Sequence, residues 1–196
     1  MDKTSLAFQA AVSAAAAGAK VAYICTHPFK RLPAQIHGMR VPESAIMNNV
    51  DFLYLEETRE LLAWFASIHT KSNLPSYIVI EDLLTYATQM NDTNVEKSLA
   101  KICATIADAV AWISSHNEVK RCQVLMTAPT RITSLYPILS KFHYRTASYQ
   151  GPGEDAPFSQ LHYESDDASI TVKFHRQNDC LMMTDVSASK QLPVYS

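Results

Sequence analysis

The chain has 196 residues and a mass of 21.8 kDa, the size of one ordinary domain. Hydrophobic residues make up 47% of it and charged residues 18%, fewer than the roughly 25% typical of soluble domains, so we expect a partner to cover part of its surface. The formal charge of −2 excludes a protein that coats nucleic acid by bulk electrostatics, and any contact with DNA must be local.

The first part of the chain alternates predicted helices and strands. An Ala-rich helix over Thr4–Ala17 is closed by Gly18, and a short apolar strand follows over Lys20–Thr26. A second apolar run, Val50–Leu55, leads into a helix from Glu56 to about His69, whose apolar residues recur at helical spacing.

The middle of the chain continues this alternation. Tyr77–Ile80 is rich in β-forming residues and continuously apolar, which is typical of a strand buried in a parallel sheet. A long helix from about Asn94 to Ser115 and a strand over Cys122–Thr127 follow. The order predicts an α/β fold with a mostly parallel sheet flanked by helices.

The last part changes character and predicts an antiparallel extension. Three strands are expected, over Ser159–Glu164, Ala168–Arg176 and Leu181–Val186, and the middle one alternates apolar and polar residues as a sheet with one wet face does. We therefore expect a single domain over residues 1–186 and a flexible tail over residues 187–196.

The cysteines and the apolar runs bear on the compartment. Four scattered cysteines without a CxxC pair, and no secretory signal, predict reduced thiols in the cytosol or nucleus. We find no apolar run near the ~20 residues that span a bilayer, and expect a soluble chain. No histidine or cysteine grouping has zinc-ligand spacing, so we expect no zinc in this chain.

The first residues suggest a phosphate-binding helix start. Asp2-Lys3-Thr4-Ser5 opens a helix as the end of a P-loop does, where Lys3 would reach the β and γ phosphates and Thr4 would bind Mg²⁺. Asp2 stands in place of the last glycine, and the first strand and most of the P-loop are missing from this chain. The alternative interpretation of Lys3, Thr4 and Ser5 is an ordinary polar helix start.

A second motif strengthens the first. The apolar run Tyr77–Ile80 ends in Glu81-Asp82, which resembles the Walker B strand, whose acidic residue holds the Mg²⁺ shell. Thr4, Glu81 and Asp82 are therefore the candidate magnesium ligands. The alternative is a surface turn with two solvated carboxylates.

Taken together, these segments resemble the RecA-like recombinase paralogues, and among them the ATPase-like subunit that accompanies a SWIM-type zinc-finger protein in the animal Shu complex. The residues that carry the resemblance are Lys3-Thr4, the Ala-rich helix, Val21–Ile24 followed by Thr26–Phe29, Thr58–Leu62, Tyr77–Asp82 and Leu181–Met183.

The resemblance implies a nuclear protein of homologous recombination. It implies a heterodimer with the SWIM-type zinc-finger protein, single-stranded DNA binding, support of recombinase filaments, and weak use of ATP and Mg²⁺. One departure concerns catalysis: no carboxylate lies between Lys20 and Val41, and His27 lies near the place of the glutamate that orients water in active relatives. General-base catalysis, worth roughly 100-fold or more, therefore lacks its residue, and we expect at most a weak DNA-stimulated ATPase.

The resemblance also directs attention to the segment after the strand that ends at Thr127. Cations there would hold a single strand, and aromatic rings would stack on its bases. The candidate DNA-binding residues are Arg131, Lys141, Arg145, Tyr136 and Tyr144. A solvated surface is the alternative for these residues. Phe8–Ala11 fits the letters of the recombinase Phe-x-x-Ala peptide, but we expect Phe8 to pack in the core.

Two further hypotheses remain open on the sequence. One is a P-loop ATPase or phosphotransferase whose first strand and glycine loop lie upstream of this chain. The other is an α/β interaction domain unrelated to recombination, in which Lys3 and Glu81 are incidental.

Overall fold

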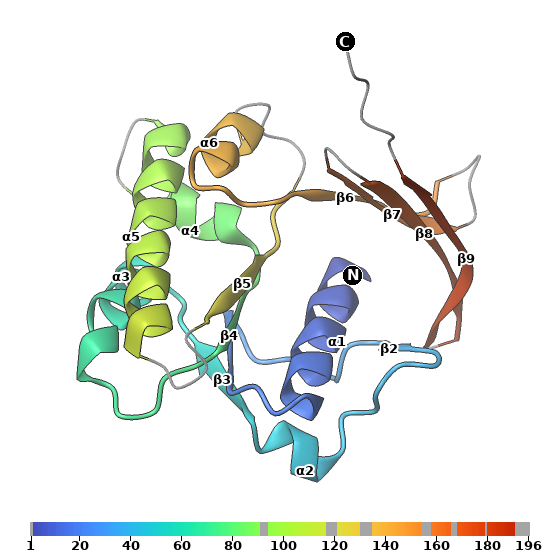
Figure 1. Cartoon of the computed structure of the whole chain (residues 1–196), viewed down its shortest axis with the longest axis horizontal. Helices are drawn as coiled ribbons and strands as arrows, with labels where there is room; N and C mark the ends of the chain where they lie inside the picture. Colours follow the sequence, from blue (N-terminus) through green and yellow to red (C-terminus); the bar gives the residue numbers. More distant parts are fainter. Residues whose placement is uncertain are drawn as a thin grey trace.

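A computed structural model gives the fold of the chain (Figure 1). It describes residues 2–90, 94–116, 121–129, 135–153, 158–165, 168–178 and 180–190. Four strands form a parallel sheet: β1 (Val21–Cys25), β3 (Val50–Tyr54), β4 (Tyr77–Ile80) and β5 (Gln123–Met126). Their order is β3-β1-β4-β5, so the two continuously apolar strands are central, as such runs predict.

Helices cover both faces of the parallel sheet. On one face, α1 (Asp2–Ala16) packs against the side chains of Val21, Tyr23 and Val79. The other face packs against α3 (Thr58–Ala66), the short 3-10 helix η1 (Ile68–Thr70), α4 (Leu83–Gln89) and α5 (Val95–His116). Figure 1 shows this layering, with α3 and α5 on one side of the sheet and α1 on the other. The parallel α/β core predicted from the sequence is confirmed.

A second sheet lies beyond α1 (Figure 1). Its strands are β6 (Ala147–Gln150), β7 (Ser159–Glu164), β8 (Ala168–Gln177) and β9 (Cys180–Lys190), all antiparallel, with β2 (Gln35–Ile36) added parallel to β9. The order is β2-β9-β8-β7-β6. Ile36, Phe174 and Leu181 form a small core to which Leu6 of α1 contributes, and this core joins the two halves of the molecule.

The strand boundary at the end of the chain differs from the prediction. β9 continues to Lys190, because Ser187, Ala188 and Ser189 pair with β8. Residues 187–190, expected in the flexible tail, therefore belong to the sheet, and residues 191–196 lie outside the described part. The run of small and polar residues at this end pairs along the ladder although its side chains are largely exposed.

Short elements account for most of the other differences. α2 (Ser44–Met47), α4, α6 (Leu135–Lys141), β2 and β6 were not predicted, and the helix expected over residues 56–69 ends at Ala66 and resumes as η1. α3 begins with a capping box between Glu57 and Glu60, which matches the predicted acidic helix start.

The core explains two sequence features. Phe8 is buried and its ring contacts those of Tyr23, Phe29 and Phe52, so the Phe-x-x-Ala letters describe core packing. By length and composition α5 could also cross a membrane, contrary to our expectation. It passes that test because one side of it is a core face, with seven residues buried against the sheet and neighbouring helices.

Candidate functional site

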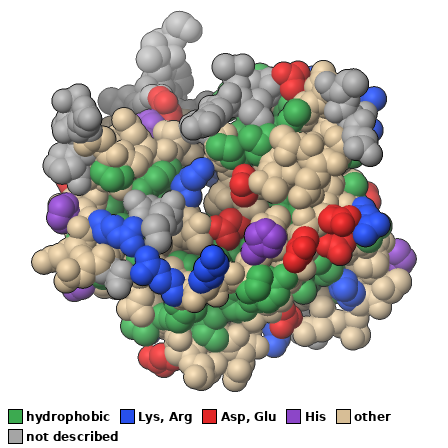
Figure 2. Space-filling view, turned by 180° about the vertical axis from the view of Figure 1, so that it is seen from behind, with side chains coloured by type: hydrophobic (Ala, Val, Ile, Leu, Met, Phe, Trp, Pro, Cys, Tyr) green, Lys and Arg blue, Asp and Glu red, His purple; other side chains and the backbone are tan. Residues whose placement is uncertain are grey.

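The start of α1 meets the carboxyl ends of β1, β4 and β5 at one pocket of about 310 Å³. Open parallel sheets place their ligand sites at this edge, because the strand ends and the helix starts converge there. The pocket is lined by Lys3, Thr4, Cys25, Thr26, His27, Glu81, Asp82, Thr127 and Pro129. Figure 2 shows the molecule from behind, with acidic, basic and histidine side chains in a band across the middle of that face.

A hydrogen-bonded chain crosses the floor of this pocket. The Thr4 hydroxyl donates to Glu81 Oε1, and the Tyr23 hydroxyl donates to Glu81 Oε2 at 3.3 Å. Tyr23 is fully buried; its burial, followed by the charge of Glu81, raises the pKa of its hydroxyl, which therefore stays protonated as a donor. Both carboxylate oxygens of Glu81 are thus held in place by side chains from α1 and β1.

Lys3 reaches from α1 to the loop after β5. Its Nζ donates to the backbone oxygen of Ala128 at 3.3 Å, just beyond the end of β5. Lys3 and Thr4 both line the pocket, whereas Ser5 is buried and is not part of the lining. Of the three residues predicted at the helix start, two therefore face the cavity and one faces the protein.

The two acidic residues after β4 have different roles. Glu81 contacts Thr4, whereas Asp82 adopts a left-handed backbone conformation with φ of 53°. Its amide donates to the Thr127 hydroxyl at 2.9 Å, and its carboxylate accepts from the Thr85 hydroxyl at 2.7 Å, at the start of α4. Glu81 is therefore the carboxylate aimed at the helix start.

The donor set suits a hard cation. Mg²⁺ prefers oxygen ligands, and the Thr4 hydroxyl and Glu81 carboxylate present oxygens to each other beside Lys3. A bound Mg²⁺ would neutralise phosphate charge at this position. Within the described ranges, no group of three or more His, Cys, Asp or Glu side chains gathers as a metal site.

Five lining residues were not predicted as site residues: Cys25, Thr26, His27, Thr127 and Pro129. The Cys25 thiol donates to the His27 backbone oxygen at 3.4 Å. Burial, then the nearby Glu81, raises its pKa to about 11, so it is a neutral thiol at physiological pH. Thr127 orients Asp82 through the hydrogen bond described above. Cys25, Thr26 and Thr127 end or follow parallel strands, and that position is the sequence signal that could have identified them.

Four of the five predicted DNA-binding residues lie on α6 or between α6 and β6. Arg131 is outside the described residues. Tyr136 and Lys141 are exposed on α6, and Arg145 donates to the Tyr163 hydroxyl at 3.4 Å. The Tyr144 ring packs against the main core, where burial raises the pKa of its hydroxyl to about 12, so much of that ring is already in protein contact.

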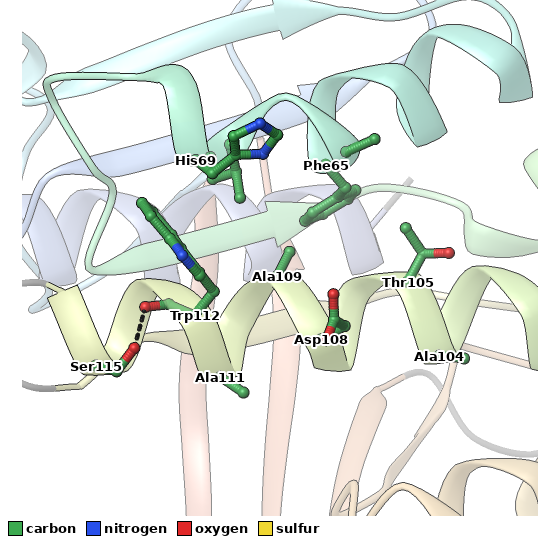
Figure 3. Close-up of a pocket in the computed structure, with 11 residues that line it drawn as sticks. Phe65, His69, Ala104, Thr105, Asp108, Ala109, Ala111, Trp112 and Ser115 are labelled. Atoms are coloured by element: carbon green, nitrogen blue, oxygen red, sulfur yellow. Dashed lines mark hydrogen bonds between the residues drawn. The ribbon is translucent and has the colours of Figure 1, made fainter.

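A larger hollow of about 820 Å³ lies elsewhere, between α5 and the α3–η1 segment. Figure 3 shows Phe65 and His69 on one side of it and a row of α5 residues, from Ala104 to Ser115, on the other. Most of its lining is alanine and aromatic, and His69 and Asp108 are its only titratable side chains. It lacks the converging polar groups that distinguish the pocket at Thr4 and Glu81.

Comparisons with known proteins agree with the fold. No protein-family model and no curated protein matches the chain. Among solved structures, the chain is similar to a DnaB-like replicative helicase, whose structure was described with its interactions with primase. The TM-score is 0.53 at 9% sequence identity, over 90% of this chain and 54% of the helicase chain.

At that identity the similarity shows the fold alone, a parallel sheet flanked by helices that is compatible with a RecA-like fold. The chain spans about half the length of the helicase chain.

Proposed function

We propose that this chain is a RecA-fold subunit that binds Mg²⁺–ATP in the pocket at Lys3, Thr4 and Glu81, and that it works in a Shu-type complex of homologous recombination. The observation that carries the nucleotide part is the meeting of Thr4 and Glu81, 77 positions apart, beside Lys3. A hydroxyl, a carboxylate and an ammonium group at one helix start are what a metal-bound phosphate chain needs.

Hydrolysis should be weak, because the residues after β1 supply His27 in the pocket lining and no carboxylate to act as a general base. Glu81 accepts hydrogen bonds from Thr4 and Tyr23, and Asp82 accepts one from Thr85, so side chains of the protein already orient both carboxylates. The proposed role is therefore binding and assembly, with nucleotide turnover slow or absent.

The recombination part rests on the resemblance of the sequence segments to the ATPase-like Shu subunit. The proposed partner is a SWIM-type zinc-finger protein, and the proposed further contacts are single-stranded DNA and a RecA-like recombinase in the nucleus. The low fraction of charged residues supports a subunit with a covered surface. The exposed Tyr136 and Lys141 on α6 support a local DNA contact.

Nucleotide binding is tested by titrating the full chain with a fluorescent ATP analogue, with Mg²⁺ and with EDTA. We expect binding that requires Mg²⁺ and is lost in Lys3→Ala and Glu81→Gln. Lys20→Ala is the matched control, since Lys20 is an exposed lysine that bonds Asn49 outside the pocket. Equal binding by Lys3→Ala and the control would refute the assignment.

The assembly role is tested by co-expression with a SWIM-type zinc-finger protein and size-exclusion chromatography. We expect one stable complex that binds a single-stranded oligonucleotide more tightly than either protein alone. Separate elution of two folded proteins would contradict this part of the proposal while leaving the nucleotide site intact.

The alternative is a P-loop ATPase or phosphotransferase completed by residues upstream of this chain. The same Lys3, Thr4 and Glu81 arrangement supports it. A longer form of the protein that hydrolyses ATP at about 1 s⁻¹ or faster, the ordinary range for enzymes, would favour this alternative.

A further inference from the structure

The segment that joins β1 to α2, residues 26–43, has an unusual surface. It contains Lys30, Arg31 and Arg40 and no carboxylate before Glu43, although the whole chain carries a net charge of −2. It also exposes Leu32 (62%), Met39 (41%) and Val41 (51%), three of the eight most exposed large apolar side chains in the described part. We call this stretch the β1–α2 segment.

The β1–α2 segment is anchored at three points. The Phe29 ring contacts the rings of Phe8, Tyr23 and Phe52. Ile36 is buried in the small core under β9, and the His37 amide donates to the Leu181 backbone oxygen at 2.9 Å. The backbone of Arg40 accepts a hydrogen bond from the buried Gln9 side chain at 3.0 Å. The exposed apolar side chains are thus held on a fixed backbone, which lowers the entropy cost of binding.

The cations of this segment form no ion pair with the part of the chain that the structure describes. Among the described residues, none forms an ion pair with Lys30, Arg31 or Arg40. Elsewhere on the surface, Arg59 pairs with Glu57 and Lys173 with Asp185. A surface that combines fixed apolar side chains with unpaired cations is complementary to an apolar segment flanked by carboxylates.

A second group of exposed apolar residues differs in this respect. Ile170, Met183 and Val186 lie on one face of the antiparallel sheet, opposite the Lys173–Asp185 pair. That face offers no unpaired cation beside its apolar side chains in the described residues, so charge does not select an occupant for it. The β1–α2 segment is therefore the better-defined surface.

We propose that the β1–α2 segment is the docking surface for the partner subunit, which presents there an apolar stretch flanked by Asp or Glu. This inference rests on the proposed assembly function and specifies its interface. Leu32 would be the central apolar contact, and Arg31 and Arg40 would pair with the partner's carboxylates. Arg is among the residue types enriched where interface affinity is concentrated, and a large apolar side chain contributes by leaving water when the partner covers it.

The test uses the full chain co-expressed with the SWIM-type zinc-finger protein, followed by chromatography and a titration of the purified proteins. We expect Leu32→Asp, and separately the pair Arg31→Glu and Arg40→Glu, each to weaken the complex about ten-fold or more, as loss of a strong interface contact does. Val186→Asp and Arg59→Glu are matched controls, because Val186 is 55% exposed and the Arg59 side chain 80% exposed outside the segment. Unchanged melting temperatures would establish that the variants are folded.

The outcomes separate the two proposals. If the unmodified chain forms no complex, the assembly function fails and this interface fails with it. If it forms a complex and the segment variants bind as tightly as the controls, the assembly function stands and the docking surface is wrong. If the segment variants keep the complex but lose binding to a single-stranded oligonucleotide, the cations serve nucleic acid instead, which also overturns the docking proposal.

Discussion

The two sheets of this protein are stabilised differently. β1 and β4 of the parallel sheet are buried between α1 on one side and α3, α4 and α5 on the other. The antiparallel sheet contains the two longest strands, but among its described residues only Ser159 and the small core of Ile36, Phe174 and Leu181 are buried, and Ile170 and Val186 are exposed. Burial dominates the first sheet and strand pairing the second, and the candidate pocket belongs to the half with the larger buried core.

The sharpest test of this difference truncates one apolar side chain in each sheet. Ile80 in β4 is fully buried, and Ile80→Ala should lower the free energy of unfolding by about 2–5 kcal/mol. Val186→Ala in β9 should change it by less than about 0.5 kcal/mol, because that side chain is already largely in water. Urea unfolding of both variants measures the contrast, and similar losses would break the comparison.

A smaller effect is expected where the pocket joins the core. Tyr23→Phe removes the donor to Glu81 Oε2 and should cost about 1–2 kcal/mol, since a partly buried carboxylate loses a hydrogen bond. It should also weaken Mg²⁺-dependent nucleotide binding by freeing the Glu81 side chain. Tyr77→Phe is the control, because the Tyr77 hydroxyl has no hydrogen-bond partner in the described structure. Equal effects of the two substitutions on nucleotide binding would exclude a positioning role for Tyr23.

Alkaline pH should act on the parallel half. Burial raises the pKa values of Cys25 and Cys103 to about 11 and that of Cys122 to about 12, from 9.0. The folded state therefore favours the neutral thiols. Their stabilising contribution is complete below pH 9 and is lost as the pH rises through 11, because the unfolded chain releases these protons first.

The urea midpoint measured between pH 8 and 10.5 should accordingly fall above pH 9. Cys103→Ala should make this decline shallower, after correction for its own loss of stability at pH 8. An unchanged slope in that variant would show that Cys103 does not titrate as its burial requires.

The smallest expected effect lies in the antiparallel sheet. Lys173 on β8 and Asp185 on β9 lie directly opposite each other, and both side chains are partly exposed. The Lys173 Nζ is 3.1 Å from the Asp185 Oδ2. A double-mutant cycle with Lys173→Ala and Asp185→Ala should give a coupling of about 0.2–1 kcal/mol that decreases with salt. A larger, salt-independent value would mean that this sheet depends on more than strand pairing.

The sequence predicted the elements whose patterns are local. The apolar runs of β1 and β4, the helical spacing of α5 and the alternation in β8 all specify one structure. β2 has two residues and exists only because β9 pairs with it, so no local pattern indicates it. α4 follows directly on the left-handed Asp82, a backbone state that the sequence did not indicate at an aspartate.

The candidate site was predictable to the extent that parallel topology determines it. Lys3 and Thr4 lie in the first turn of α1, and Glu81 directly follows β4. Helix starts and parallel strand ends meet at one sheet edge, so the proximity of these residues followed from the α/β order. Tyr23 did not stand out, because a tyrosine in an apolar strand is usually a core residue, and only its hydrogen bond to Glu81 in the structure reveals a polar role. Thr4 faces the pocket and its neighbour Ser5 faces the protein interior. This difference depends on tertiary packing, which no local sequence pattern indicates.

β5 ends the strand order on one side, and in the described residues only β4 pairs with it. Its outer row of backbone amides and carbonyls is a template for one more strand. Parallel strands end at a common edge of the sheet. Ala128, two residues beyond the end of β5, accepts a hydrogen bond from Lys3. A strand that joined β5 in parallel would therefore end at the rim of the pocket, so that its last residues would become part of the pocket wall.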